Sequence, residues 1–251
     1  MKIKDIYDYI DSFAPYSSQF SWDNSGLTAG SMTAEVTGAA VCLDATVAAA
    51  EFAEKNGCNT IISHHPSIFR PVKAVGADSA VYAAIRRGLN TLSAHTNWDM
   101  ADGGVNDTLA RILDLSDVEK LYEEDKPILR MGNVPERSPA EFAAFVSEKL
   151  SAAVKYTVGK TPVRKVAVGG GSCGDLADVA FLAGCDAFVT GEAKHNEMIR
   201  ANELGITLVV AGHYETENPS MYVFLDLLRK RFPDEKFLFF EENPGKCAIS
   251  N

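Results

Sequence analysis

The sequence lacks the features that would direct it to a membrane, a secretory pathway or nucleic acid. No apolar run approaches the roughly 20 residues needed to cross a bilayer, and the start, MKIKDIYDYI, has no signal-peptide pattern. Positive charge is scarce, since 24 Lys and Arg stand against 34 Asp and Glu, a formal net charge of −10. This charge gives no general attraction to phosphates or anionic lipid. We therefore expect a cytoplasmic protein that binds neither membrane nor nucleic acid.

Cysteine is also sparse, with five residues in 251 and none in a C-x-x-C pair. An odd number without paired spacing is typical of reduced, mostly buried thiols. We therefore predict no disulfide framework and no thiolate ligands among Cys42, Cys58, Cys173, Cys185 and Cys247.

The order of apolar segments predicts an α/β fold. Apolar residues at three- and four-residue spacing indicate an opening helix that stops before Pro15. From residue 36 onward, short β-branched or apolar runs alternate with helical stretches, which predicts mainly parallel sheets with crossover helices. A capping box from Ser138 to Glu141 opens a later helix that runs to about Leu150.

Two stretches of the chain resemble each other. Gly57 and Gly88 precede two strands of the first series, and Gly184 and Gly205 precede two strands of the second, at offsets of 127 (184 − 57) and 117 (205 − 88) residues. Between the series lies a charged, proline-rich segment. We predict two similar α/β halves, residues 1–125 and 126–251, in one two-lobed unit without an inserted domain.

Histidines and acids concentrate just after the predicted strands, where open α/β sheets bind ligands. His64 and His65 end one apolar strand, and Pro66 favours an extended backbone after them. Adjacent residues of a regular strand point to opposite faces, so the pair serves one site only if the backbone bends there. Otherwise each histidine serves a different ion. An adjacent pair at a strand end is typical of metal ligands rather than of core histidines.

Two further pairs follow later strands. His95 and Asp99 are four residues apart, and Asp99 is a metal ligand or, equally, a turn residue. His213 and Glu217 have the same spacing, but Pro219 predicts that a loop entering a helix carries them. With Asp99 as the better ligand candidate of its pair, the set is His64, His65, His213, Asp99 and Glu217. These three imidazoles and two carboxylates exceed one tetrahedral zinc site, so two ions of zinc, iron or manganese that share a carboxylate fit better. Two metal ions that share a carboxylate are typical of hydrolases, because they can polarise a substrate and generate hydroxide.

The segment Gly169–Gly174 follows a strand and allows two interpretations. It is either a phosphate cradle or a close approach of backbone to the site, since it lacks the lysine of a P-loop. At the next strand end, Glu192, Lys194 and His195 are candidates for contacts with ligand residues or substrate.

As a set, these motifs resemble the GTP cyclohydrolase 1 type 2, or Nif-three-like, family. They are Trp22-Asp23-Asn24-Ser25-Gly26-Leu27, Ser63-His64-His65-Pro66, His95-Thr96-Asn97-Trp98-Asp99, Gly169-Gly170-Gly171-Ser172, Thr190-Gly191-Glu192, and Gly212-His213 with Thr216-Glu217. The resemblance implies two divalent metal ions per chain in the cleft between two α/β halves, and a toroidal homohexamer. It also implies that His65, Asp99 and Glu217 bind one ion, and that His64, His213 and Glu217 bind the other, with Glu217 bridging.

The resemblance gives the first functional hypothesis, a metal-dependent hydrolase that opens the imidazole ring of GTP and releases formate. His95 would move protons, and Arg70, Lys73, Lys194 and Arg164 are the cations available to a small-molecule substrate such as a nucleotide. The alternative is a metal-binding regulatory or metal-handling scaffold without this turnover. DNA binding is a third hypothesis, against which the negative charge counts.

Overall fold

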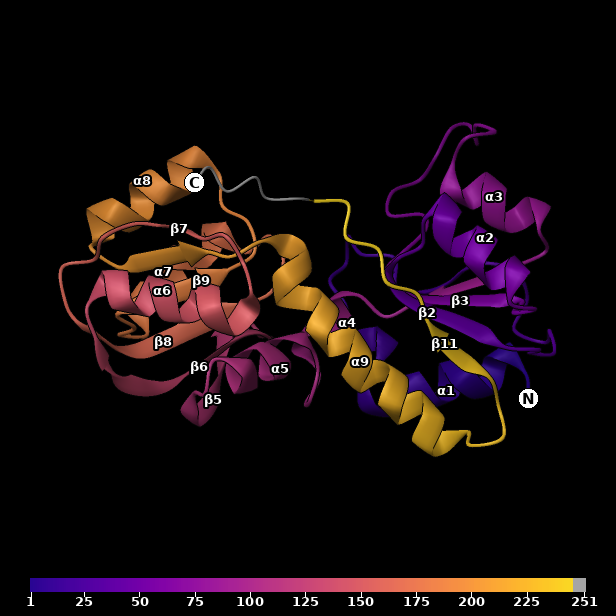
Figure 1. Ribbon diagram of the computed structural model, residues 1–251, viewed down its shortest axis with the longest axis horizontal. Helices are drawn as coiled ribbons and strands as arrows, with labels where there is room; N and C mark the ends of the chain where they lie inside the picture. The colour runs from indigo at the N-terminus through magenta and orange to yellow at the C-terminus, as the bar shows by residue number, and fades with distance from the viewer. Residues whose placement is uncertain (246–251) are drawn as a thin grey trace. The chain divides into compact units, whose positions relative to one another are not determined.

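The computed structural model describes residues 1–245, which form two compact units. The first unit contains Met1–Asp102 and Met221–Pro244, and the second contains Gly103–Ser220 and Gly245. Each unit combines one sheet with helices, which confirms the predicted α/β class (Figure 1). No helix in residues 1–245 is both long enough and apolar enough to span a bilayer.

The first unit contains a mainly parallel five-stranded sheet. Its neighbours, in order, are β1 (Gly26–Ala29), β4 (Asn90–Ser93), β3 (Thr60–His65), β2 (Ala39–Asp44) and β11 (Phe237–Phe239). Only β1 runs antiparallel to its neighbour. The carboxyl ends of β2, β3 and β4 therefore meet at one edge of this sheet, where the sequence places three of its five histidines.

Helices cover this sheet on both faces. They are α1 (Ile3–Phe13), η1 (Tyr16–Ser18), α2 (Val47–Lys55), α3 (Ala80–Arg86), α4 (Thr96–Met100) and the part of α9 (His213–Arg231) from Met221 onward. The alanine-rich faces of α2 and α3 pack on β2 and β3, and α1 lies on the other side of the sheet (Figure 1). α1 matches the predicted opening helix, with Ile3, Ile6 and Ile10 fully buried.

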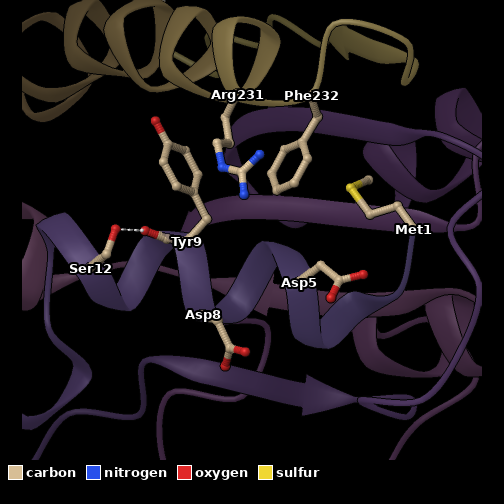
Figure 2. Close-up of a pocket in the computed structure, with 7 residues that line it drawn as sticks. All are labelled: Met1, Asp5, Asp8, Tyr9, Ser12, Arg231 and Phe232. Atoms are coloured by element: carbon tan, nitrogen blue, oxygen red, sulfur yellow. Dashed lines mark hydrogen bonds between the residues drawn. The ribbon is translucent and has the colours of Figure 1, made fainter.

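A hollow of about 530 Å³ opens between α1 and the end of α9 within the first unit. Figure 2 shows the Arg231 guanidinium between the rings of Tyr9 and Phe232, and its carbon lies 5.8 and 5.0 Å from their centroids. The remaining lining residues are Met1, Asp5, Asp8 and Ser12. This hollow contains none of the predicted site residues.

The second unit has a mixed six-stranded sheet. In order, its strands are β5 (Ser116–Glu123), β6 (Lys126–Arg137), β8 (Val163–Gly169), β9 (Ala187–Thr190), β10 (Thr207–Val210) and β7 (Lys155–Tyr156). β8, β9 and β10 are parallel, whereas the other three pairings are antiparallel. The expectation of a mainly parallel sheet therefore fails here, because the two-residue connection from β5 to β6 can join only antiparallel strands.

The helices of the second unit are α5 (Val105–Ile112), α6 (Pro139–Leu150), η2 (Gly174–Leu176), α7 (Ala177–Leu182), α8 (His195–Leu204) and the start of α9. α5 and α6 share a core with β8 and β9. The predicted capping box is present: the Ser138 hydroxyl accepts from the Glu141 amide at 3.3 Å, and the Glu141 carboxylate accepts from the Ser138 amide at 2.8 Å.

The two sheets repeat one pattern. The order β1-β4-β3-β2 in the first unit corresponds to β7-β10-β9-β8 in the second, with one antiparallel pairing followed by two parallel ones in each. This likeness supports the predicted similarity of two halves. The boundary predicted between residues 125 and 126, however, falls in the β5–β6 turn, whose strands pair with each other. The compact units instead divide after Asp102 and inside α9.

Candidate metal centre

Three histidines gather at the strand ends of the first unit. His64 and His65 end β3, and His95 lies between β4 and α4. Their ring centroids lie 4.9 Å (His64 to His65), 5.1 Å (His64 to His95) and 5.4 Å (His65 to His95) apart. One ligand atom from each lies within 4.8 Å of the others. His64 and His65, which are adjacent on β3, thus form one group together with His95.

Each of these rings is held through its Nδ1 atom. His64 Nδ1 lies 2.9 Å from the Ala94 carbonyl oxygen, His65 Nδ1 lies 2.7 Å from Asp44 Oδ1, and His95 Nδ1 lies 2.8 Å from Asp23 Oδ1. Because these oxygens accept, Nδ1 carries the hydrogen and the lone pair of the neutral ring lies on Nε2. Hydrogen bonds of this kind orient histidines that bind metals. The donor set therefore fits zinc, iron or manganese.

No role was predicted for the two aspartates that hold His65 and His95, although Asp23 belongs to the motif Trp22-Asp23-Asn24-Ser25-Gly26-Leu27. Asp44 ends β2 and is in register with His65 across the parallel pairing of β2 with β3. Burial alone would raise the pKa of Asp23, but hydrogen bonds with His95 and Thr96 outweigh it and hold this pKa well below its usual range. Asp23 is therefore an ionised partner for His95. The available signal was the position of Asp44 at a strand end beside another site strand.

Asp99 lies beside one member of this group, His64. It lies one helical turn after His95, and its amide donates to the His95 carbonyl at 3.0 Å. Its buried carboxylate places Oδ1 3.5 Å from His64 Nε2. Asp99 lies inside α4 rather than in a turn, and its role as a ligand stays a prediction.

In the second unit, His213 and Glu217 form a pair on the first turn of α9. His213 Nε2 lies 3.0 Å from Glu217 Oε2, and His213 Nδ1 lies 3.4 Å from Glu192 Oε2. The prediction that a loop carries this pair is wrong, because α9 already begins at His213. Pro219 lies inside the helix, where it has no amide hydrogen to donate, a cost that the remaining turns of this 19-residue helix tolerate.

The glycine-rich segment serves this pair through close approach. Gly171 has a φ of +66°, and a Cβ atom there would overlap the Glu217 carboxylate and lie 3.2 Å from His213 Nε2. The amides of this segment are engaged by side chains, since Gly170 donates to Asn106 Oδ1 at 2.8 Å and Gly171 donates to Thr216 Oγ1 at 3.1 Å. Of the two sequence interpretations, the geometry favours the close approach over the phosphate cradle.

Gly171→Ala is expected to push the Glu217 carboxylate away from His213 and to lower the affinity for divalent metal by about 10-fold or more. The matched control is Gly184→Ala, since Gly184 has a φ of +76° but nothing within 4 Å of an added Cβ. Both variants carry similar backbone strain, and only the first adds a clash. Calorimetric titration with Zn²⁺ or Mn²⁺ measures the difference. Equal affinities in the two variants would contradict the close-approach interpretation.

Asp44→Ala is expected to lower metal affinity by about 10- to 100-fold, because His65 loses the acceptor that orients its ring. Asp44→Asn keeps an acceptor oxygen and should restore part of the affinity. Asp178→Ala is the control, because the Asp178 side chain is 43% exposed against 40% for Asp44 and pairs with Arg200. The same metal titration measures these affinities. Equal metal affinity in Asp44→Ala and Asp178→Ala would contradict a role for Asp44 in orienting His65.

The remaining candidates lie outside these groups. His195 is exposed at the start of α8, and Lys194 Nζ pairs with Glu197 at 3.1 Å. The Cys173 thiol donates to the Gly170 carbonyl at 3.2 Å. Burial raises the pKa of Cys185 to about 11, and raises that of Cys42 further, which keeps both thiols protonated. Cys247 lies outside the described residues, and the absence of thiolate ligands stays a prediction.

The fold and these residues define a class of protein, a two-unit α/β protein with candidate metal-binding histidines and carboxylates at the ends of parallel strands. The chain belongs to the Duf34/NIF3 (NGG1p interacting factor 3) family, whose model matches residues 1–244. This confirms the resemblance that the motifs indicated.

Similar proteins agree with this membership. A protein of Clostridium acetobutylicum named GTP cyclohydrolase 1 type 2 homolog is 30% identical over 235 residues, which cover 89% of this chain and 88% of that protein. Reduced HcgD from Methanocaldococcus jannaschii has a similar structure, with a TM-score of 0.83 and 26% identity over 95% of this chain and 97% of its own. A Bacillus cereus protein related to NIF3 shares the fold with a TM-score of 0.90 and 19% identity, over 100% of this chain and 99% of its own.

Proposed function

We propose that this protein is a divalent-metal-dependent hydrolase of the GTP cyclohydrolase type, which opens the imidazole ring of the guanine base and releases formate. The group of three histidines, each held through Nδ1, is the observation that carries the proposal. The names of relatives such as that of Clostridium acetobutylicum supply the reaction.

We propose two divalent ions per chain, with ligands His64, His65 and Asp99 from the first unit and His213 and Glu217 from the second. Two observations made within the units support these ligands: Asp99 lies beside His64, and Glu217 lies beside His213. When bound, such ions supply Lewis acidity for the polarisation of substrate and the activation of water. A toroidal homohexamer and a cytoplasmic location stay predictions.

His95 is the residue that we assign to proton transfer. Its ring is partly exposed, whereas His64 is fully buried. The Asp23 carboxylate accepts from Nδ1 and fixes the orientation of the ring, so Nε2 is the atom that would accept a proton and return it.

The alternative, a metal-handling or regulatory scaffold, is favoured by one observation. Two of the four cations expected to bind a triphosphate are paired with carboxylates of their own unit: Arg164 with Glu136 at 2.7 Å and Lys194 with Glu197 at 3.1 Å. Arg70 and Lys73, on an exposed loop of the first unit, are the other two.

Formate release from GTP separates these two functions. We expect the metal-loaded protein to release formate, to stop after chelation and to resume when metal is restored. The double variant His65→Ala with Glu217→Ala should stay inactive under all three conditions. If the metal-loaded protein releases no formate from GTP, the proposed hydrolase is wrong and the metal-handling or regulatory scaffold is supported.

A further inference from the structure

Three aromatic rings gather beside His95 in the first unit. Trp22 stacks on Phe20 with centroids 5.4 Å apart, and the ring of Phe69 lies 5.8 Å from that of Trp22. The His95 ring meets Trp22 and Phe69 edge-on, at 6.3 and 5.7 Å. We call Phe20, Trp22 and Phe69 the aromatic cluster.

Two of the three rings in the cluster are exposed to solvent. Trp22 is 56% exposed and Phe69 is 42% exposed. Single exposed aromatic residues are common on protein surfaces and need no explanation. Two half-exposed rings that contact each other, and that both contact a histidine of the candidate metal centre, form an apolar surface next to that centre.

Hydrogen bonds fix the two loops that carry these rings. Asn24 Nδ2 donates to the Ile68 carbonyl at 2.6 Å, which ties the loop of Trp22 to the loop of Phe69. The His95 amide donates to Ser25 Oγ at 3.0 Å, which ties the first loop to the histidine. The rings are therefore held in position before any ligand arrives, which lowers the entropy lost on binding.

We infer that the aromatic cluster binds a purine base by stacking and places it beside His95. This inference rests on the proposed function for the choice of base. Aromatic side chains stack on any base through its π-face, and stacking on one side chain contributes roughly 1–3 kcal/mol. Arg70 follows Phe69 directly and Lys73 lies three residues further, so the same exposed loop supplies positive charge for phosphates.

Binding of GTP to chelated, metal-free protein tests the inference without turnover. Titration calorimetry should show that Trp22→Ala and Phe69→Ala each weaken GTP binding by roughly 5- to 150-fold, the stacking energy expressed as affinity. Trp22→Phe keeps a ring and should restore most of the affinity. Phe181→Ala is the matched control, since Phe181 is 41% exposed on α7 of the second unit.

Inorganic tripolyphosphate is the base-free probe. Its affinity should be the same in wild type and in the aromatic variants, because only the base stacks. Fluorescence gives a second reading: Trp98 is fully buried, so quenching of the wild-type signal by GTP reports Trp22 and should be lost in Trp22→Phe.

Three outcomes would overturn the inference: no GTP binding by wild type at millimolar concentration, equal GTP affinity in wild type and Trp22→Ala, or the same loss of tripolyphosphate and GTP binding. A smaller assembly for Trp22→Ala in light scattering, with unchanged GTP affinity, would identify the cluster as a contact between copies of the chain.

GTP that stacks but yields no formate would refute the proposed hydrolase alone. Formate release with an unchanged KM in Trp22→Ala would refute the stacking site alone.

Discussion

Glu217→Ala should strip the protein of most of its divalent metal, from about two ions per chain to nearly none. Under the proposed ligand set, Glu217 serves both ions and Asp99 serves one, so Asp99→Ala should keep more metal. Within the second unit, the Glu217 carboxylate is buried beside His213. Elemental analysis of protein purified without chelator measures both variants.

Two controls sharpen this comparison. Asp226→Ala removes an exposed carboxylate from the same helix and should leave the metal content unchanged. Glu217→Gln keeps the shape of the side chain but not its charge, and should fall between wild type and Glu217→Ala. Equal losses in Glu217→Ala and Asp99→Ala would argue against a bridging role for Glu217. A metal content near one ion per chain in wild type under metal excess would contradict the proposal of a second ion.

Trp98→Ala should lower the free energy of unfolding by about 3–5 kcal/mol, the usual cost of removing a buried aromatic ring. Trp98 is fully buried, and its ring meets Phe13 and Phe224 edge-on with centroids 5.7 and 5.1 Å away. It also anchors α4, so a second effect should follow: weaker metal binding, because the next residue is Asp99.

Urea denaturation followed by circular dichroism measures the first effect. Trp22→Ala is the internal control, because this side chain is 56% exposed and its loss should change the free energy of unfolding by no more than about 0.5 kcal/mol. A Trp98→Ala protein as stable as Trp22→Ala would mean that α4 is held by other contacts. Unchanged metal affinity in a folded Trp98→Ala protein would show that the packing of Trp98 is not needed to position Asp99 for metal binding.

The sequence by itself determined the features that depend on near neighbours in the chain. The opening helix follows from apolar spacing, the start of α6 follows from its capping box, and the positions of His64, His65 and His95 follow from the ends of apolar strands. Parallel strands bring their carboxyl ends to one edge, so the meeting of these histidines could be predicted without coordinates.

Features that depend on partners far along the chain were decided only by the tertiary structure. Asp44 and Asp23 lie 21 and 72 residues from the histidines that they hold, and no local pattern links them. The mixed second sheet arises in part because the charged segment before α6 forms the β5–β6 hairpin, with β5 at the edge of the sheet, although its composition is typical of a linker as well as of an edge region. The need for glycine at 171 comes from the Glu217 carboxylate, 46 residues later (217 − 171), because only packing brings that side chain against the loop.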